Sequence, residues 1–283
     1  RKETTDLLLR IPVPSPTAVS TQLANVGSVE NKGIELEISA DIITKDDFTW
    51  TSSFNYSRNR NKVLSLSNNQ FQGENIQIAP LAGQGLSGIF AQLIQPGLAV
   101  GTFYGREFIG IENGEEIIDD EEKVIGSAQP DFTFGFSNSF TYKRFTLGLN
   151  FRGSIGNDVF NLTANNLGYL SNLPGRNVFK EALTSGVLRS QPKQYSSRWI
   201  EDGSFVRLDN ITLGYNFDLK TTSALSSARI FITGQNLLLF TKYSGLDPEV
   251  NSDVSGTGIA PLGVDYLAYP KAKTVSLGLN ISF

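Results

Sequence analysis

The chain of 283 residues contains no cysteine, no methionine and no histidine. Without cysteine it cannot form a disulfide framework, a thiolate nucleophile or an iron–sulfur site. Without histidine it has no Ser-His-Asp triad, no imidazole-bound zinc and no histidine-ligated haem. Because a complete translation product begins with methionine, the start Arg1-Lys2-Glu3-Thr4 leads us to expect a processed chain or a fragment.

The net charge and the lack of long apolar runs exclude further classes of protein. The net charge is −4, from 24 basic and 28 acidic residues, so no basic surface indicates a nucleic acid as partner. The sequence has no apolar run of about 18 residues, which a membrane-spanning helix requires, and no signal peptide at its start. The 19 Phe, 9 Tyr and 27 Gly favour β-structure. If this protein lies in a membrane, it crosses as strands.

Apolar and polar side chains alternate with a period of two in residues 34–42, 48–56, 132–142, 145–152 and 274–283. A half-buried strand of a soluble β-sandwich has the same pattern. Two details favour a transmembrane barrel: the polar faces carry few charges, and aromatic residues gather near the segment ends. These residues are Phe48, Trp50, Tyr142, Phe145, Tyr215 and Phe217.

Connection lengths also indicate an outer-membrane barrel. Segments 44–47 and 143–144 are very short, whereas 11–24, 65–130, 158–198 and 241–271 are long. Such barrels have short periplasmic turns and long outer loops. We assign 102–111 to a long outer loop and predict eight spans, which end with a periplasmic C-terminus: 1–10, 25–43, 47–64, 131–142, 145–157, 199–217, 228–240 and 272–283.

Several stretches resemble, in order along the chain, the SusC-like (SusC/RagA) TonB-dependent transporters of the Bacteroidetes outer membrane. The first is Asn25-Val26-Gly27-Ser28-Val29-Glu30-Asn31-Lys32-Gly33-Ile34-Glu35. A later one is Arg198-Trp199-Ile200-Glu201-Asp202-Gly203-Ser204-Phe205-Val206-Arg207-Leu208. Residues 4–8, 130–136, 156–161, 234–237, 243–249 and 269–273 also agree with the family.

The resemblance implies an all-β fold: an antiparallel transmembrane barrel of about 22 strands around a plug. Residues 1–283 would form the C-terminal part of this barrel, with the plug and the N-terminal strands absent from the chain. Eight such strands form an arc with two open edges, and each unpaired backbone group in lipid costs several kcal/mol. We therefore expect the arc to pair with the remainder of the barrel and plug, in a separate chain or a missing segment.

The resemblance also implies a function in the outer membrane, where this family imports nutrient oligomers, glycans or peptides. A SusD-like surface lipoprotein would close over the barrel, TonB would supply energy, the lipid bilayer would surround the wall, and no enzymatic step is implied. Two alternatives stay open at this point. They are a soluble β-sandwich that binds glycans and a passive, porin-like barrel.

Three carboxylates of an acidic segment, Asp119, Asp120 and Glu122, are candidates for calcium binding in an outer loop. The segment lacks the D-x-[DN]-x-[DN]-G spacing of calcium-binding loops, so a solvated charged loop is the favoured interpretation. We expect no other metal or cofactor.

Aromatic residues in or beside the long connections are candidates for contacts with a ligand or a partner protein. These residues are Tyr169, Tyr195, Trp199, Tyr243, Tyr266 and Tyr269, and simple packing within the loops explains each of them equally well. Phe283 ends the last alternating segment. A C-terminal aromatic residue of this kind resembles the signal by which outer-membrane barrels are recognised for assembly.

Overall fold

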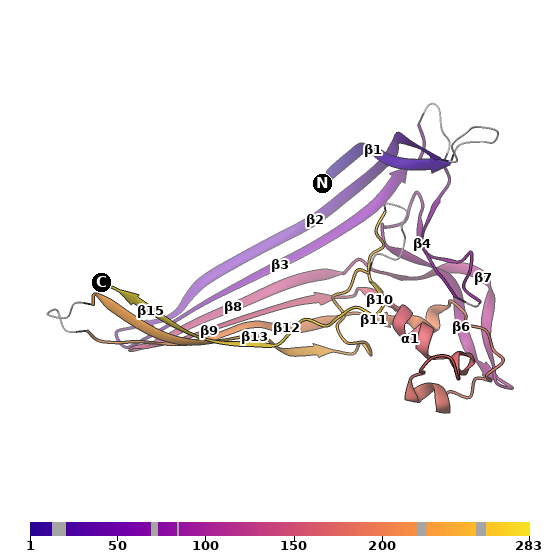
Figure 1. Ribbon diagram of the computed structural model, residues 1–283. Helices are drawn as coiled ribbons and strands as arrows, with labels where there is room; N and C mark the ends of the chain where they lie inside the picture. The colour runs from indigo at the N-terminus through magenta and orange to yellow at the C-terminus, as the bar shows by residue number, and fades with distance from the viewer. Residues whose placement is uncertain (13–20, 69–72, 84, 220–224, 253–258) are drawn as a thin grey trace.

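A computed structural model describes residues 1–12, 21–68, 73–83, 85–219, 225–252 and 259–283 (Figure 1). Eight strands form one antiparallel sheet in the order β1-β2-β3-β8-β9-β12-β13-β15. Their bounds are β1 (Lys2–Pro12), β2 (Thr21–Lys45), β3 (Phe48–Ser65), β8 (Phe132–Tyr142), β9 (Phe145–Ile155), β12 (Phe205–Asn216), β13 (Ser227–Thr241) and β15 (Thr274–Ser282). The predicted number of eight spans is therefore confirmed, and residues 102–111 lie outside this sheet as expected.

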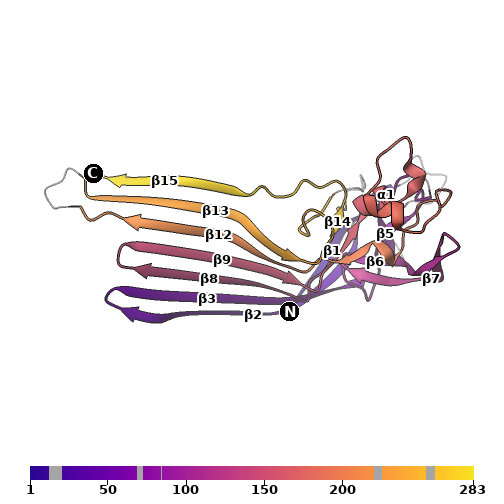
Figure 2. The ribbon, with the colours of Figure 1, turned by 90° about the horizontal axis from the view of Figure 1, so that it is seen from below.

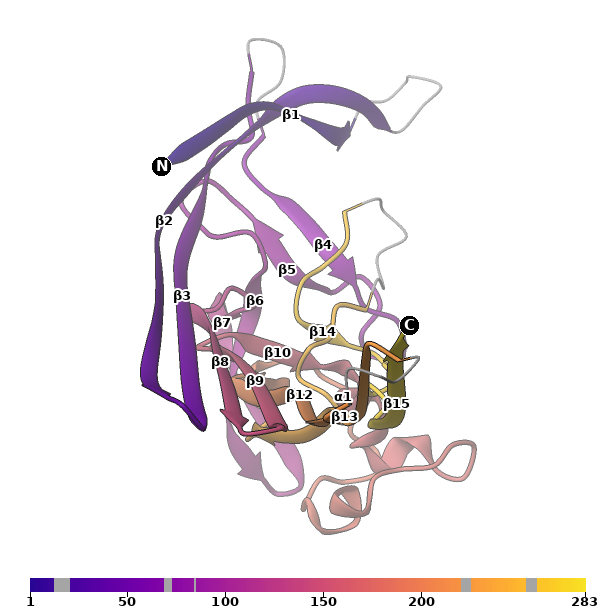
Figure 3. The same cartoon turned by 90° about the vertical axis from the view of Figure 1, so that its left-hand side faces the viewer.

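The sheet is an open arc (Figure 3). Strands β1 and β15 each have a neighbour on one side only, so both edges of the described sheet are unpaired. The β-sandwich alternative is wrong, because all eight strands lie in one sheet whose apolar side chains are exposed. None of the described helices is long and apolar enough to cross a lipid bilayer.

The apolar residues of the alternating segments lie on one face of the arc. Ile232 of β13 pairs with Leu213 of β12 and Leu277 of β15, and all three side chains are exposed. On the opposite face, the hydroxyls of Thr212 and Thr233 lie 2.9 Å apart. The sheet thus has an apolar face and a polar face, as a barrel wall between lipid and lumen requires.

The short turns and the C-terminus lie at one end of the sheet, and the long connections lie at the other (Figures 1 and 2). Aromatic pairs gather at the short-turn end, where Phe48 lies opposite Tyr142 in the sheet. The rings of Phe145 and Tyr215 approach to 4.8 Å between centroids. This is the clustering near strand ends that the sequence indicates.

The long connections fold together into an end body. It contains a four-stranded sheet, a three-stranded sheet, one α-helix and three 3₁₀ helices. Their bounds are β4 (Ile76–Pro80), β5 (Phe90–Ile94), β6 (Thr102–Glu112), β7 (Glu115–Ser127), β10 (Asp158–Asn161), β11 (Ile200–Asp202), β14 (Val264–Asp265), α1 (Leu162–Leu167), η1 (Leu170–Asn172), η2 (Lys180–Thr184) and η3 (Ser197–Trp199). The predicted span 199–217 is too long at its start, because Ile200–Asp202 pairs with β10 instead.

Local sequence explains two features of the end body. Asn113 and Gly114 both have positive φ, 51° and 83°, which suits the Asn-Gly turn that joins β6 to β7. Asn161 caps α1 by accepting a hydrogen bond from the Ala164 amide at 2.8 Å. A buried core that includes Phe103, Phe160 and Val264 joins the connections 65–130, 158–198 and 241–271. The end body therefore has an apolar interior of its own.

The exposed apolar face predicts that lysine substitutions at two neighbouring residues of β13 have very different effects on the free energy of unfolding. In the full-length protein, Ile232→Lys places an ammonium on the apolar face and should lower the free energy of unfolding in lipid by about 2–4 kcal/mol. Thr233→Lys places the same charge on the polar face and should have a much smaller effect. Urea titration in lipid vesicles measures both, and equal losses would contradict this assignment of the faces.

Candidate functional site

The polar face becomes irregular where β12 and β13 approach the end body. The pairing of β12 with both neighbours shifts between Leu208 and Asn210. Asp209 is an extra residue relative to β9, whereas on the other side two residues of β13 lie opposite Asp209. Opposite it, Asn236 of β13 adopts a φ of +54°. Bulges of this kind redirect side chains. Asn236 accepts a hydrogen bond from Arg207 and donates one to the Lys271 carbonyl at 2.8 Å.

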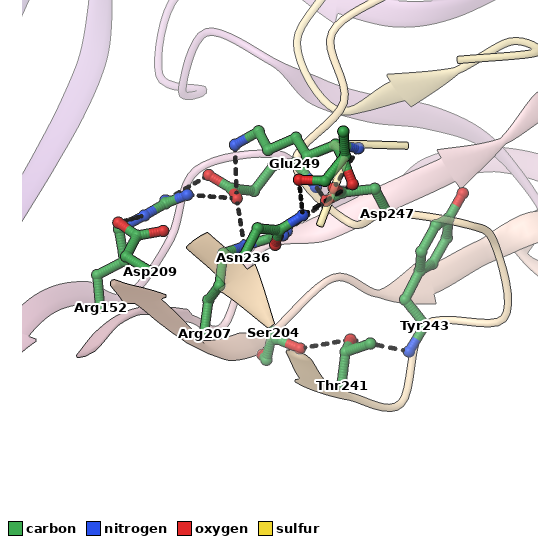
Figure 4. Close-up of polar contacts among 11 residues, drawn as sticks. Arg152, Ser204, Arg207, Asp209, Asn236, Thr241, Tyr243, Asp247 and Glu249 are labelled. Atoms are coloured by element: carbon green, nitrogen blue, oxygen red, sulfur yellow. Dashed lines mark hydrogen bonds and ion pairs between the residues drawn. The ribbon is translucent and has the colours of Figure 1, made fainter. Parts of the chain in front are cut away.

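A charge cluster lies at this bulge and joins β9 and β12 to the 242–273 connection (Figure 4). Its members are three cations and three anions: Arg152, Arg207, Lys271, Asp209, Asp247 and Glu249. Arg207 is its most buried member, with 1% of the side chain exposed. Its guanidinium lies 2.7 Å from Asp247 and 2.9 Å from Glu249. The connection is therefore bound to the sheet through buried charges.

Glu249 lies at the centre of the cluster. One of its carboxylate oxygens is 2.6 Å from an Arg152 nitrogen and 2.8 Å from Lys271 Nζ. Arg152 also pairs with Asp209 at 2.5 Å. Burial by itself raises the pKa of Glu249, but hydrogen bonds from Arg152 and Lys271 outweigh it and leave the pKa below 4.5. Glu249 is thus a stable anion at neutral pH.

A hollow of about 650 Å³ lies beside the cluster on the polar face of the sheet. Arg152, Glu249 and Lys271 line it together with Asn55 and with Phe205, whose ring lies under the Arg152 guanidinium. These groups offer hydrogen bonds and ring faces to a polar solute. Among the described residues no group of three or more acidic side chains is arranged to hold a metal ion.

Four of the predicted contact aromatics are buried and hydrogen-bonded. Tyr169 donates to Glu116 at 2.7 Å, and Trp199 packs beside it with ring centroids 5.7 Å apart. Tyr195 donates to the Ala91 carbonyl at 2.6 Å. Tyr243 donates to Asp265 at 2.7 Å. Burial raises the phenol pKa of all three tyrosines, so each remains a hydrogen-bond donor. In this structure the four rings pack inside the end body.

The remaining predicted residues are on the surface. The exposed fractions of Tyr266 and Tyr269 are 45% and 96%, and that of Phe283 is 91%. Ligand or partner contacts of the two tyrosines stay a prediction, as does the assembly role of Phe283.

The acidic segment is a strand rather than an irregular loop. Asp119, Asp120 and Glu122 all lie in β7, where successive side chains point to opposite faces. Asp119 forms an ion pair with Lys123 at 3.2 Å. A hydrogen bond from the Glu121 amide, followed by the one from Lys123, lowers the pKa of Asp119. Calcium binding here stays a prediction.

Reasoning from the sequence missed the charge cluster, although four of its six residues, Arg207, Asp247, Glu249 and Lys271, lie in stretches that carry the family resemblance. Arg207 and Asp247 are separated by 40 positions, and Arg152 and Glu249 by 97. One signal was available: Arg152 stands on the polar face of a strand that otherwise shows Thr146, Gly148 and Asn150 there. Its partner lies in an aperiodic connection, where no sequence pattern identifies it.

The arc and its end body define the class of the protein: a segment of antiparallel barrel wall whose long connections form a separate folded layer. Residues 1–237 match the family model "TonB dependent receptor-like, beta-barrel". The chain belongs to this family of TonB-dependent receptor-like β-barrels.

Individual relatives agree with this assignment. TonB-dependent receptor P3 of Formosa agariphila is 34% identical over 99% of this chain and 31% of its own length. TonB-dependent receptor SusC of Bacteroides thetaiotaomicron is 32% identical over 100% of this chain and 29% of its own. A solved structure of the RagAB peptide transporter has the same fold, with a TM-score of 0.78 at 24% identity over 99% of this chain and 32% of that one. The chain thus spans about a third of the length of these relatives.

The unequal burial of two aspartates in the charge cluster predicts that their replacement by asparagine has unequal effects on the free energy of local opening. Asp247→Asn in the full-length protein leaves Arg207 buried without its nearest charge, and should lower the free energy of local opening of residues 242–252 by about 3–5 kcal/mol. Asp209 is 39% exposed, so Asp209→Asn should cost about 0–1 kcal/mol. Hydrogen–deuterium exchange of residues 242–252 measures both costs. Similar values for the two variants would contradict the buried pairing.

The lowered pKa of Glu249 predicts a pH dependence. A carboxylate with a lowered pKa contributes stability above its unfolded value of 4.5 and loses it as the pH falls through the folded value. Exchange of residues 242–252, corrected for intrinsic rates, should therefore increase as the pH falls below 4.5. Glu249→Gln should remove this increase. An unchanged pH profile in that variant would assign the titration to another group.

Proposed function

We propose that this chain forms part of the wall of a TonB-dependent importer in the bacterial outer membrane. The observation that carries the proposal is the two-faced arc, apolar on one side and polar on the other, in a chain that belongs to the TonB-dependent receptor family. The apolar face would contact lipid, and the polar face would line the lumen. The short turns and the C-terminus would lie in the periplasm, and the end body would lie outside.

The two open edges of the eight-stranded sheet are evidence that the chain is part of a larger assembly. Strands β1 and β15 present unpaired backbone groups that lipid does not satisfy, and the relatives are about three times as long as this chain. The remaining barrel strands and a plug would close the arc and occlude its lumen.

The relatives suggest the cargo and the partners. One is named SusC, and a structural relative is described as a peptide transporter. We propose the uptake of nutrient oligomers, glycans or peptides, with a SusD-like lipoprotein over the end body, TonB on the periplasmic side and no catalytic step. The charge cluster would hold the 242–273 connection in place while the cargo passes.

Energy coupling separates this proposal from a passive porin. Cells with the full-length protein should deplete an oligosaccharide or peptide mixture from the medium, as followed by mass spectrometry, and cells without the gene should not. A protonophore that collapses the inner-membrane gradient should stop uptake and leave surface binding intact. Uptake that continues after this treatment would indicate a passive barrel.

A further inference from the structure

The apolar face of the arc changes to a basic one along β3. Within residues 48–56 the positions on this face carry Phe, Trp, Ser, Phe and Tyr, none of them charged. The next three positions on the same face are Arg58, Arg60 and Lys62, and all three are exposed. On the neighbouring strand β2, Lys32 lies opposite Arg60 and belongs to the same face. We call these four residues the basic rim.

The opposite face of the same stretch of β3 is covered by the end body. Val63 is completely buried in a small apolar core, and Asn61 accepts a hydrogen bond from the Val100 amide at 2.8 Å. Successive side chains of a strand point to opposite faces, so the basic rim points away from the end body. Its cations therefore lie on the side of the wall that would face the membrane.

Cations outnumber anions on this surface. Its charged residues are five cations and three anions: Arg1, Lys32, Arg58, Arg60, Lys62, Glu3, Glu30 and Asp131. Glu30 is the most buried of the anions, with 7% of its side chain exposed, and it pairs with Arg1 and Lys32. The surface is thus locally positive in a chain whose net charge is −4.

The level of the basic rim matches that of lipid headgroups. The rings of Tyr56 and Phe132, 5.3 Å apart between centroids, directly precede it, and aromatic rings gather where hydrocarbon meets headgroups. From Arg58 to Lys62 the strand rises about 13 Å, or about 10 Å along the bilayer normal at a tilt of about 40°. The headgroup layer of one leaflet is about 5–8 Å thick. The long stems of these side chains cover the remaining difference.

Phosphate is the headgroup chemistry that these side chains bind best. A guanidinium forms paired, charge-assisted hydrogen bonds with phosphate oxygens, and an ammonium adds a point charge. Arg60 and Lys32 are direct neighbours across β2 and β3, where Cβ atoms lie about 5 Å apart, so both can reach one phosphate. An uncharged headgroup would make no use of three successive cations on one face.

We propose that the basic rim binds the phosphate groups of an anionic lipid in the outer leaflet of the membrane. The inference rests on the proposed function for its orientation, since the rim lies at the same end of the wall as the end body. It goes beyond that function, because the lipid is a partner of the wall and not the cargo.

The full-length protein, purified from the outer membrane in nonionic detergent with any lipoprotein that accompanies it, tests the proposal. Lipid A, a phosphorylated glycolipid, is titrated into it and its binding is followed by native mass spectrometry. The combined changes Arg58→Gln, Arg60→Gln and Lys62→Gln should weaken binding about tenfold or more. Lipid A without its phosphates should bind the unchanged protein equally weakly, with no further loss in the triple variant. Arg58→Lys, Arg60→Lys and Lys62→Arg together should retain binding.

A second triple variant is the matched control. It removes three cations at the short-turn end and should leave lipid A binding unchanged: Lys45→Gln, Lys143→Gln and Arg144→Gln. Equal losses in the two triple variants, or equal binding of the two forms of lipid A, would overturn the proposal. Displacement of lipid A by inorganic phosphate would assign the rim to the free ion instead. Loss of the accompanying lipoprotein from the rim variant would assign it to a protein contact.

An unchanged thermal transition shows that each variant is folded, and uptake measured in parallel separates the two proposals. Phosphate-dependent lipid binding at the rim without energised uptake retains this inference and removes the importer. Energised uptake with lipid A binding that is insensitive to the rim does the reverse.

Discussion

Backbone hydrogen bonding across the eight-stranded sheet is the constraint on which the rest of the molecule depends. A strand in lipid has to satisfy its N–H and C=O groups on its neighbours, since the bilayer supplies no water. Strands paired in this way present alternate side chains to opposite faces, so one face is apolar and the other polar. Antiparallel pairing also places successive connections at alternate ends. The folded end body at one end, with short turns at the other, follows from this arrangement.

Where the regular ladder is interrupted, the chain acquires its most specific contacts. The bulge at Asp209, with Asn236 in a left-handed conformation opposite it, brings polar side chains to the junction of sheet and end body. The buried charges of Arg207 and Asp247 are stable there because each is hydrogen-bonded within a cluster of three cations and three anions. The 242–273 connection is thereby attached to the wall by directional contacts, which nonspecific apolar packing would not provide.

Much of the barrel wall was predictable, because a half-buried strand alternates apolar and polar residues, and this alternation is visible in the sequence. The alternation in 132–142 and 145–152 identified β8 and β9 with bounds within a few residues. The start of β12 was not predictable, because Ile200–Asp202 is extended like a barrel strand but pairs with β10. A strand of the barrel wall and a strand of the end body both fit the local pattern of residues 200–202. Only the strand with which they pair distinguishes the two.

The sequence by itself determined the class of fold, the number of strands in the arc, and the absence of cysteine and histidine chemistry, because these depend on composition and on neighbouring residues. The tertiary structure alone decided which polar and aromatic residues meet. Tyr169 and Tyr243 were candidates for exposed contacts and lie buried on Glu116 and Asp265. Arg207 was not a candidate site residue and is the most buried member of the charge cluster. The physical reason is that the loops have no period, so burial and charge pairing arise there only from contacts between distant segments.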